Sequence, residues 1–169
     1  MRVNEVTKTL FKKYHKPEDY LAVPVEELEE DIRPTGFFHN KAKSLRGLCE
    51  ALIQNHAGQV PKTMDEMTKL PGVGRKTANV VLGTAYGLVT GVVVDTHVRR
   101  LTYRMGLTKE SDPEKIEKDL MAILPQEVWI DFSHVLIWHG RAVCVARKPK
   151  CSACTVADFC PQEGVTVSV

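Results

Sequence analysis

Apolar residues recur at helical spacing along almost the whole sequence, and this pattern constrains the fold more than any other feature. The three clearest stripes are Val3, Val6, Leu10 and Tyr14; Leu45, Leu48, Leu52 and Ile53; and Val128, Phe132, Val135, Leu136 and His139. Intervals of three and four residues place such side chains on one face of a helix. The one strand-like run, residues 92–94, is too short to build a sheet. We therefore predict an all-α protein of about seven or eight short helices, the last covering residues 126–143.

Two helix starts are marked by capping residues. Thr63 followed by Glu66, and Ser111 followed by Glu114, each fit a capping box. Pro113 falls near the first turn of the second helix, where its missing N–H costs least. The sequence therefore predicts helices that begin just after Thr63 and Ser111.

Length and hydropathy limit the class of protein. The chain has 169 residues, enough for one ordinary domain or two small ones that share an interface. No apolar run approaches the roughly 20 residues that a membrane span needs. The N-terminal stretch is amphipathic, without the basic and apolar regions of a secretory signal. We predict a cytoplasmic protein with no membrane partner.

Charge is distributed unevenly along the chain, although the formal net charge is only +2. Residues 18–31 contain acids and no bases. Many bases fall later, beside a glycine-rich turn and the C-terminal cysteines, at Arg75, Lys76, Arg99, Arg100, Arg104, Arg141, Arg147, Lys148 and Lys150. If the fold gathers them on one face, that face attracts a polyanion. The alternative is an ordinary solvated surface.

The stretch Leu70-Pro71-Gly72-Val73-Gly74 predicts a tight turn between two helices. The second helix should begin near Gly74 or Arg75, with its free N–H groups pointing outward. Such a helix end is an anion site, and the glycines would let a phosphate approach the backbone. This is the helix-hairpin-helix pattern, which binds the DNA backbone without reading its sequence. We predict DNA contacts at Gly72, Val73, Gly74, Arg75 and Thr77.

Lys76 and Asp95 are the candidate catalytic side chains. Lys76 falls on the first turn of the predicted helix, where the helix dipole and Arg75 both disfavour the ammonium and favour a nucleophilic amine. The alternative is a lysine that only attracts phosphate. Asp95 ends an apolar run just before a helical pattern, so it is an N-cap, a carboxylate at a pocket edge, or both. His97 packs or caps, or it contacts DNA.

Three segments together resemble the endonuclease III family of DNA repair glycosylases: LPGVGRKTANVV, VDTHVRR and HGRAVCVARKPKCSACTVADFC. The resemblance runs from about Val3 to Cys160. It implies a helix-hairpin-helix glycosylase domain in which Lys76 attacks the sugar C1′ of a damaged nucleotide and Asp95 assists. It also implies a monomer that acts in base excision repair on double-stranded DNA with oxidised pyrimidines or abasic sites, and that associates with the nucleoid through that DNA.

Lys76 helps to distinguish a bifunctional glycosylase and lyase from a monofunctional glycosylase. Relatives that remove adenine keep the aspartate and generally lack this lysine, so Lys76 favours a bifunctional glycosylase and lyase that cuts 3′ to the lesion by β-elimination. Two alternatives stay open: a module that binds damaged DNA without turnover, and a monofunctional mismatch or adenine glycosylase.

Residues 35–41 correspond to a family loop that fills the space left by the extruded nucleotide. Phe37 or Phe38 is the candidate wedge, because an exposed aromatic ring stacks where a base has been removed. The alternative is that both rings belong to the core.

Four cysteines, Cys144, Cys151, Cys154 and Cys160, crowd into the C-terminal residues, while Cys49 lies alone in a helical pattern and should be buried. Four thiolates suit zinc or an iron–sulfur cluster. The resemblance implies a [4Fe–4S] cluster with these ligands. Arg147, Lys148 and Lys150 fall between the first two ligands and should face phosphates. We expect a helical domain over residues 1–143 and a cluster loop and tail over residues 144–169.

Family members usually have further residues before the point at which this sequence begins. They include a helix that packs near the cluster, an apolar helix of the glycosylase domain and a polar residue inserted opposite the lesion. Either Met1 is a late or misassigned start, or the domain closes with fewer helices and leaves apolar surface for a partner.

Overall fold

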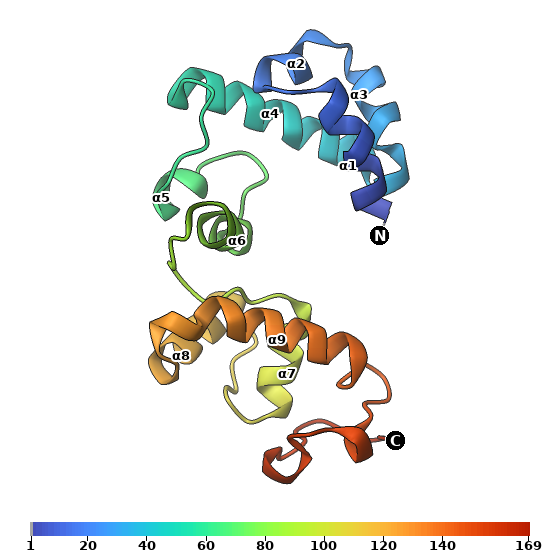
Figure 1. The fold of residues 1–169 in the computed structure, drawn as a ribbon, viewed down its shortest axis with the longest axis vertical. Helices are drawn as coiled ribbons and strands as arrows, with labels where there is room; N and C mark the ends of the chain where they lie inside the picture. The colour runs from blue at the N-terminus through green and yellow to red at the C-terminus, as the bar shows by residue number, and fades with distance from the viewer. Residues whose placement is uncertain (1) are drawn as a thin grey trace. The chain divides into compact units, whose positions relative to one another are not determined.

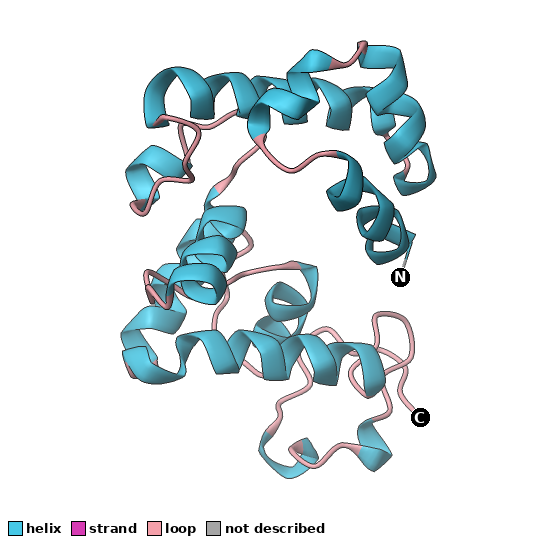
Figure 2. Cartoon of the chain, turned by 45° about the horizontal axis from the view of Figure 1, so that its top comes forward, coloured by secondary structure: helices cyan, strands magenta, loops and turns pink. Residues whose placement is uncertain are grey.

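The computed structural model of the chain describes residues 2–169 and shows a helical protein (Figures 1 and 2). The α-helices of this part are α1 (Arg2–Lys13), α2 (Pro17–Ala22), α3 (Val25–Ile32), α4 (Phe38–His56), α5 (Met64–Met67), α6 (Arg75–Tyr86), α7 (Thr96–Arg104), α8 (Pro113–Ile123) and α9 (Trp129–Ala142). Short 3-10 helices are η1 (Arg33–Thr35), η2 (Gln126–Val128), η3 (Cys151–Ala153) and η4 (Ala157–Phe159). No strand forms within residues 2–169, which confirms the all-α prediction. None of these helices is long and apolar enough to span a membrane.

The chain divides into two compact units, which meet in sequence at Ala78 and Asn79. The first unit contains α1–α5 and the first turn of α6. The second contains the rest of α6, the helices α7–α9 and the C-terminal residues. Each unit has a hydrophobic core of its own.

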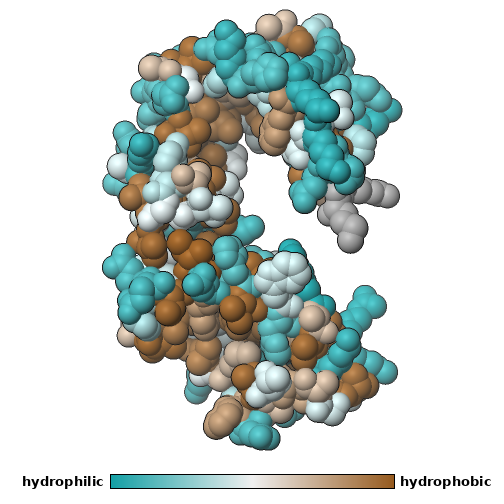
Figure 3. All heavy atoms as spheres, in the orientation of Figure 1, coloured by the Kyte–Doolittle hydropathy of each residue, from teal (hydrophilic) through white to brown (hydrophobic). Residues whose placement is uncertain are grey.

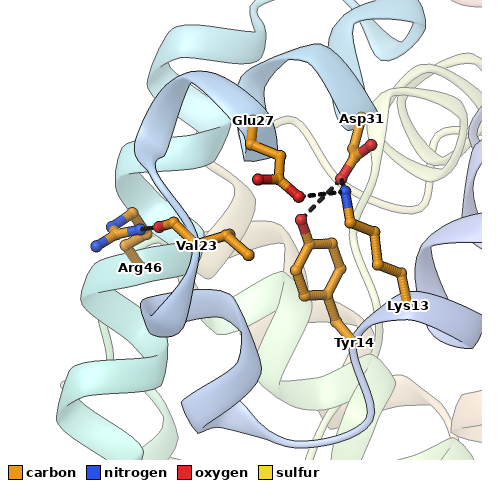
Figure 4. Close-up of polar contacts among 6 residues, drawn as sticks. All are labelled: Lys13, Tyr14, Val23, Glu27, Asp31 and Arg46. Carbon is orange, nitrogen blue, oxygen red and sulfur yellow. Dashed lines mark hydrogen bonds and ion pairs between the residues drawn. The ribbon is translucent and has the colours of Figure 1, made fainter.

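The first unit packs its short N-terminal helices against α4 (Figure 1). Its core consists of Leu10, Tyr14, Leu28, Ile32 and Ala42. The guanidinium of Arg46 on α4 donates a hydrogen bond to the carbonyl oxygen of Val23 at 2.7 Å (Figure 4). It also donates to the carbonyl oxygen of Tyr20 at 3.2 Å, so it fixes the end of α2. Hydrophilic residues predominate on the visible face of α1–α3 (Figure 3).

A polar contact joins α1 to α3. Lys13 Nζ lies 2.6 Å from Asp31 Oδ2 and 2.8 Å from Glu27 Oε1, and Tyr14 Oη donates to Asp31 Oδ2 at 2.7 Å (Figure 4). Burial acts to raise the pKa of Asp31, but the hydrogen bonds from Lys13 and Tyr14 outweigh it and hold that pKa below its ordinary value. Asp31 therefore stabilises the fold in its ionised form.

Replacing Asp31 by asparagine is expected to make the free energy of unfolding less dependent on pH in the acid range. Because the folded-state pKa lies below that of the unfolded chain, about 3.9, the ionised carboxylate contributes stability above that pH and loses it as the pH falls through the folded-state value. Urea unfolding of both proteins at steps from neutral pH down to about pH 2 should show a difference that shrinks on the acid side. Glu5→Gln on α1, which breaks only an exposed pair with Lys8, is the control. A difference that is constant with pH would contradict the prediction.

An apolar groove of about 580 Å³ lies within the first unit. It is lined mainly by α1, α4 and residues 71–73, and two of its lining side chains, Val3 and Phe11, are 51% and 61% exposed. The first unit thus presents apolar surface.

The second unit is built around a core of Val92, Val94, Val98, Leu101, Ile116, Leu120, Trp129 and Leu136. The helix α7 packs against α9 (Figure 1). Residues 92–94 are extended and buried between these elements, and Ser133 Oγ on α9 accepts a hydrogen bond from Val93 N at 3.1 Å. The last predicted helix, 126–143, is a 3-10 turn followed by α9.

One of the two predicted caps lies one residue away from its expected place. Thr63 caps α5 as predicted, accepting from Glu66 N and donating to the Glu66 carboxylate. The cap of α8 is Asp112 and not Ser111, and its Oδ1 accepts from the N–H groups of Glu114 and Lys115. Pro113 is the first residue of α8, so the capping position is the residue before it.

Candidate functional site

The glycine turn ends where α6 begins, at Arg75, as the sequence predicts. Gly72 has a φ of +75°, and a Cβ there would lie 3.0 Å from Ser44 Cβ on α4. The missing side chain of Gly72 therefore allows the turn and its packing on α4. The approach of a phosphate to this glycine stays a prediction. A Cβ on Gly74 would meet nothing within 4 Å. The open position is the one directly before the helix.

Lys76 is the second residue of α6, and its side chain is exposed, as is that of Thr77, whereas Arg75 is half-buried. The first N–H groups of a helix have no partner within that helix. The start of α6 therefore presents backbone donors, and the Lys76 amine lies on the same turn. Lys76 belongs to the first unit, and its helix continues into the second.

Asp95 is the N-cap of α7. Its Oδ1 accepts hydrogen bonds from the N–H groups of His97 and Val98, both at 2.8 Å. Within residues 2–169, Oδ2 accepts no hydrogen bond. The two interpretations of Asp95 are therefore compatible, because one oxygen caps the helix and the other is left for another contact.

His97 packs inside the second unit. His97 Nδ1 lies 3.2 Å from Arg100 Nη2. A Cβ on Gly140 would lie 2.9 Å from His97 Nδ1. The glycine in α9 thus makes room for the imidazole. This agrees with the packing interpretation, and contact with DNA stays a prediction.

The two adjacent phenylalanines have different environments. Phe37 is 87% exposed and precedes α4 with a φ of +50°. Phe38 packs against the core of the first unit, with the guanidinium of Arg33 over its ring. Only Phe37 is thus placed to act on a partner, and its role as a wedge stays a prediction.

The four C-terminal cysteines line a single cavity, together with residues that include Arg104, His139, Val143 and Val165. Among residues 2–169, no three His, Cys, Asp or Glu side chains are grouped so as to hold a single metal ion. Four thiolates around one cavity suit zinc or a cluster of several irons. Cys49 is separate from them, and it is buried, as predicted.

Arg104, the last residue of α7, ties the cysteine loop to that helix. Its guanidinium lies 3.3 Å from Cys144 Sγ and donates to the carbonyl oxygens of Val145 at 2.8 Å and Ala146 at 2.7 Å. Arg100, one turn earlier, donates to the Cys144 carbonyl at 2.9 Å. Our sequence analysis did not assign this role to either arginine, although their spacing of four residues indicated a shared helix face.

The loop between the first two cysteines exposes Arg147, Lys148 and Lys150 and buries Pro149. Its backbone is fixed by the C-terminal residue, since Val169 N donates to the Pro149 carbonyl and the Val169 carbonyl accepts from Ser152 N. Much of this region is loop (Figure 2). The three cations are therefore held on the outside of the cysteine loop.

Comparison with known proteins identifies the family. Residues 1–126 match the HhH-GPD superfamily base excision DNA repair protein, and residues 144–160 match the iron-sulfur binding domain of endonuclease III. Endonuclease III of Synechocystis sp. is 52% identical over 160 residues, which cover 95% of this chain and 73% of the relative. The enzyme of Bacillus subtilis is 49% identical over 94% of this chain and 72% of its own length. The chain belongs to the endonuclease III family.

Solved structures of endonuclease III agree with this assignment. A non-covalent endonuclease III–DNA complex superimposes with a TM-score of 0.90 at 48% identity, covering 95% of this chain and 75% of that one. A trapped endonuclease III–DNA covalent intermediate gives the same values. A thermostable thymine-DNA glycosylase gives a TM-score of 0.85 at 28% identity.

Membership of the endonuclease III family confirms the predicted fold, enzyme class and cofactor. The chain is a base excision repair enzyme, a DNA glycosylase and abasic-site lyase, whose partner is DNA. It carries an iron–sulfur cluster. The roles of individual residues are not fixed by this assignment.

Replacing Cys154 by serine is expected to prevent loading of the cluster. A serine removes one of the four thiolates that would hold the cluster, so iron content per chain should fall by about tenfold and the brown colour should be lost. Iron and sulfide analysis with visible absorption measures this. Cys49→Ala, which removes a cysteine from the first unit, should keep the wild-type iron content. Full iron in the Cys154 variant would exclude it as a ligand.

Proposed function

We propose that this chain removes oxidised pyrimidines from duplex DNA and cuts the strand 3′ to the abasic site through an imine between Lys76 Nζ and the sugar C1′. The observation that carries the proposal is the exposed amine of Lys76 on the first turn of α6, directly after the open Gly74 position. A relative with 48% identity forms a trapped covalent intermediate with DNA, which supports a covalent mechanism.

Base release and capture of the sugar are the first steps. As the glycosidic bond breaks, its electron pair leaves with the base, and positive character develops on C1′. The Asp95 carboxylate stabilises that charge through Oδ2, the oxygen that does not cap α7. The Lys76 lone pair forms the new bond to C1′, and the amine gives up its proton to the departing base.

Strand cleavage follows from the imine. The C1′–O4′ bond breaks with its electron pair on O4′, which takes up a proton from water, while the Nζ lone pair forms the C=N bond. The resulting iminium acidifies the C2′ proton. Loss of that proton forms the C2′–C3′ double bond, and the C3′–O bond breaks with its electron pair on the phosphate. Water then hydrolyses the imine and returns the Lys76 amine.

Two regions bind the DNA backbone, the start of α6 and the cysteine loop. The N–H groups at the start of α6, with Gly72, Val73, Gly74, Arg75 and Thr77, hold phosphates near the lesion. Arg147, Lys148 and Lys150 contact phosphates from the cysteine loop, and Phe37 fills the space left by the extruded nucleotide. His97, whose backbone N–H donates to Asp95 Oδ1, contacts the DNA beside that carboxylate.

Cys144, Cys151, Cys154 and Cys160 are the proposed ligands of a [4Fe–4S] cluster. When bound, the cluster supplies a fixed centre that orders the loop carrying the three cations. We assign residues 1–143 to the glycosylase domain and residues 144–169 to the cluster loop and tail. The enzyme acts as a monomer.

The test uses three otherwise identical duplexes, with thymine glycol, an abasic site or no lesion. Each is incubated with the iron-loaded protein, with and without borohydride. We expect strand cutting at both lesions and a covalent adduct with borohydride, and neither with intact DNA. Binding without any product would favour the damaged-DNA-binding module. Base release with an intact strand until alkali is added would favour a monofunctional glycosylase.

A further inference from the structure

Glu117 on α8 is a buried carboxylate that the proposed mechanism does not use. Only 4% of it is exposed, and the residue before it, Ile116, belongs to the core of the second unit. A carboxylate is costly to bury unless it is held by polar partners. Asn79 Nδ2 on α6 donates to Glu117 Oε1 at 2.8 Å.

Gly91 makes room for this carboxylate. A Cβ on Gly91 would overlap Glu117 Oε1 and would lie 3.0 Å from Asn79 Nδ2. The carboxylate thus lies directly against the backbone of residue 91. Any larger residue at this position must displace Glu117 or the backbone.

Residue 91 begins the segment that ends at Asp95. Thr90 Oγ1 donates to Asn79 Oδ1 at 2.8 Å, so the asparagine joins the start of this segment to Glu117. Val93 N donates to Ser133 Oγ, which fixes its middle. Side chains from α6, α8 and α9 therefore fix this segment and, with it, the position of Asp95 at its end.

The same network anchors the helix that carries Lys76. Asn79 follows Lys76 by three residues on α6, and both belong to one continuous helix. Residues three apart lie one turn apart on the same side of a helix. A shift of Asn79 would therefore be transmitted to the first turn of α6.

We propose that Glu117 is a positioning residue for catalysis: through Asn79 and the Gly91 backbone it holds both the segment that ends at Asp95 and the helix that carries Lys76. This inference rests on the proposed function. Placement errors of about 1 Å cost about 100-fold in rate in enzymes of known geometry, so the rate is the sensitive measure of such a role.

The test compares the iron-loaded wild type with Glu117→Ala, Glu117→Gln and Thr90→Val. The measurements are the single-turnover rate of strand cutting and borohydride adduct formation on an abasic duplex, the dissociation constant for that duplex, and the thermal midpoint. Leu120→Ala is the matched control, since Leu120 lies on the same helix, is fully buried and takes part in none of the hydrogen bonds described above. All rates are measured well below the lowest thermal midpoint.

We expect the alanine variant to lose about 30-fold or more in rate while its duplex affinity stays within about threefold. Glu117→Gln should recover most of that loss, because its amide oxygen can still accept from Asn79. Leu120→Ala should lose thermal stability but keep the wild-type rate. If Glu117→Ala does not fold, Thr90→Val, which removes one hydroxyl, should still lower the rate about threefold.

Different outcomes overturn the two proposals. A wild type that cuts and traps, with Glu117→Ala no slower than Leu120→Ala, would overturn the positioning role alone. So would wild-type rates in both Glu117→Gln and Thr90→Val if the alanine variant does not fold. A wild type that neither cuts nor traps would overturn the proposed function and this inference with it.

Discussion

Replacing Lys76 by alanine is expected to abolish the borohydride adduct and to lower strand cutting by about 1000-fold or more, because no other amine replaces the nucleophile at C1′. The fold should be unaffected, since the side chain is exposed and alanine is the best helix former. Gel analysis of trapped product and a single-turnover cutting assay on an abasic duplex measure the loss.

Two further variants test whether Lys76 acts as the nucleophile or only contacts a phosphate. Lys76→Arg keeps the positive charge but stays protonated, so it should bind the duplex within about threefold of wild type and form no adduct. Lys69→Ala, which removes an exposed lysine just before the turn, should retain both adduct and cutting. Adduct formation by the alanine variant would assign the nucleophile to another residue, and Lys76 would then be a phosphate contact.

Replacing Asp95 by asparagine is expected to lower the rate of base release by about 100-fold or more at nearly unchanged stability. Asparagine is as good an N-cap as aspartate, so the hydrogen bonds from His97 N and Val98 N should persist. What is lost is the negative charge that faces the developing cation on the sugar. Single-turnover release from a thymine-glycol duplex, beside a thermal unfolding curve, measures both effects.

The alanine variant of Asp95 should lose the cap as well, which costs about 1 kcal/mol. Asp112 provides the matched comparison, because its Oδ1 also caps a helix through two backbone N–H groups. Asp112→Ala should therefore lose similar stability and keep the wild-type rate. If Asp95→Asn releases base as fast as wild type, Asp95 is only a cap.

Local signals predicted the helices, and the places of Lys76 and Asp95 at two helix starts, because such signals act over a few residues. The turn at residues 70–74 set the start of α6 at Arg75, and the apolar run before Asp95 set the start of α7. The register error at Ser111 has a local cause too, since a proline at the first helical position fixes the cap at the residue before it.

Other features depend on residues far apart in the sequence. Ser44 and Gly72 meet only because α4 packs on the turn, so the sequence did not show that this glycine is needed for packing. Asn79 and Glu117 are 38 residues apart, and nothing in either helical pattern indicates a hydrogen bond between them. The contact of Arg104 with the cysteine loop is equally remote, because it joins residues 40 apart.

The helix α7 has consequences for handling this protein. Its nine residues begin directly after Asp95 and end at Arg104, whose guanidinium binds the backbone of the cysteine loop, the proposed site of the cluster. Loss of the cluster during storage, seen as loss of colour, would thus free the C-terminal end of α7. The N-terminal end of the same helix carries Asp95. The ratio of visible to ultraviolet absorbance is therefore a quality measure to record for every batch before kinetic values are compared.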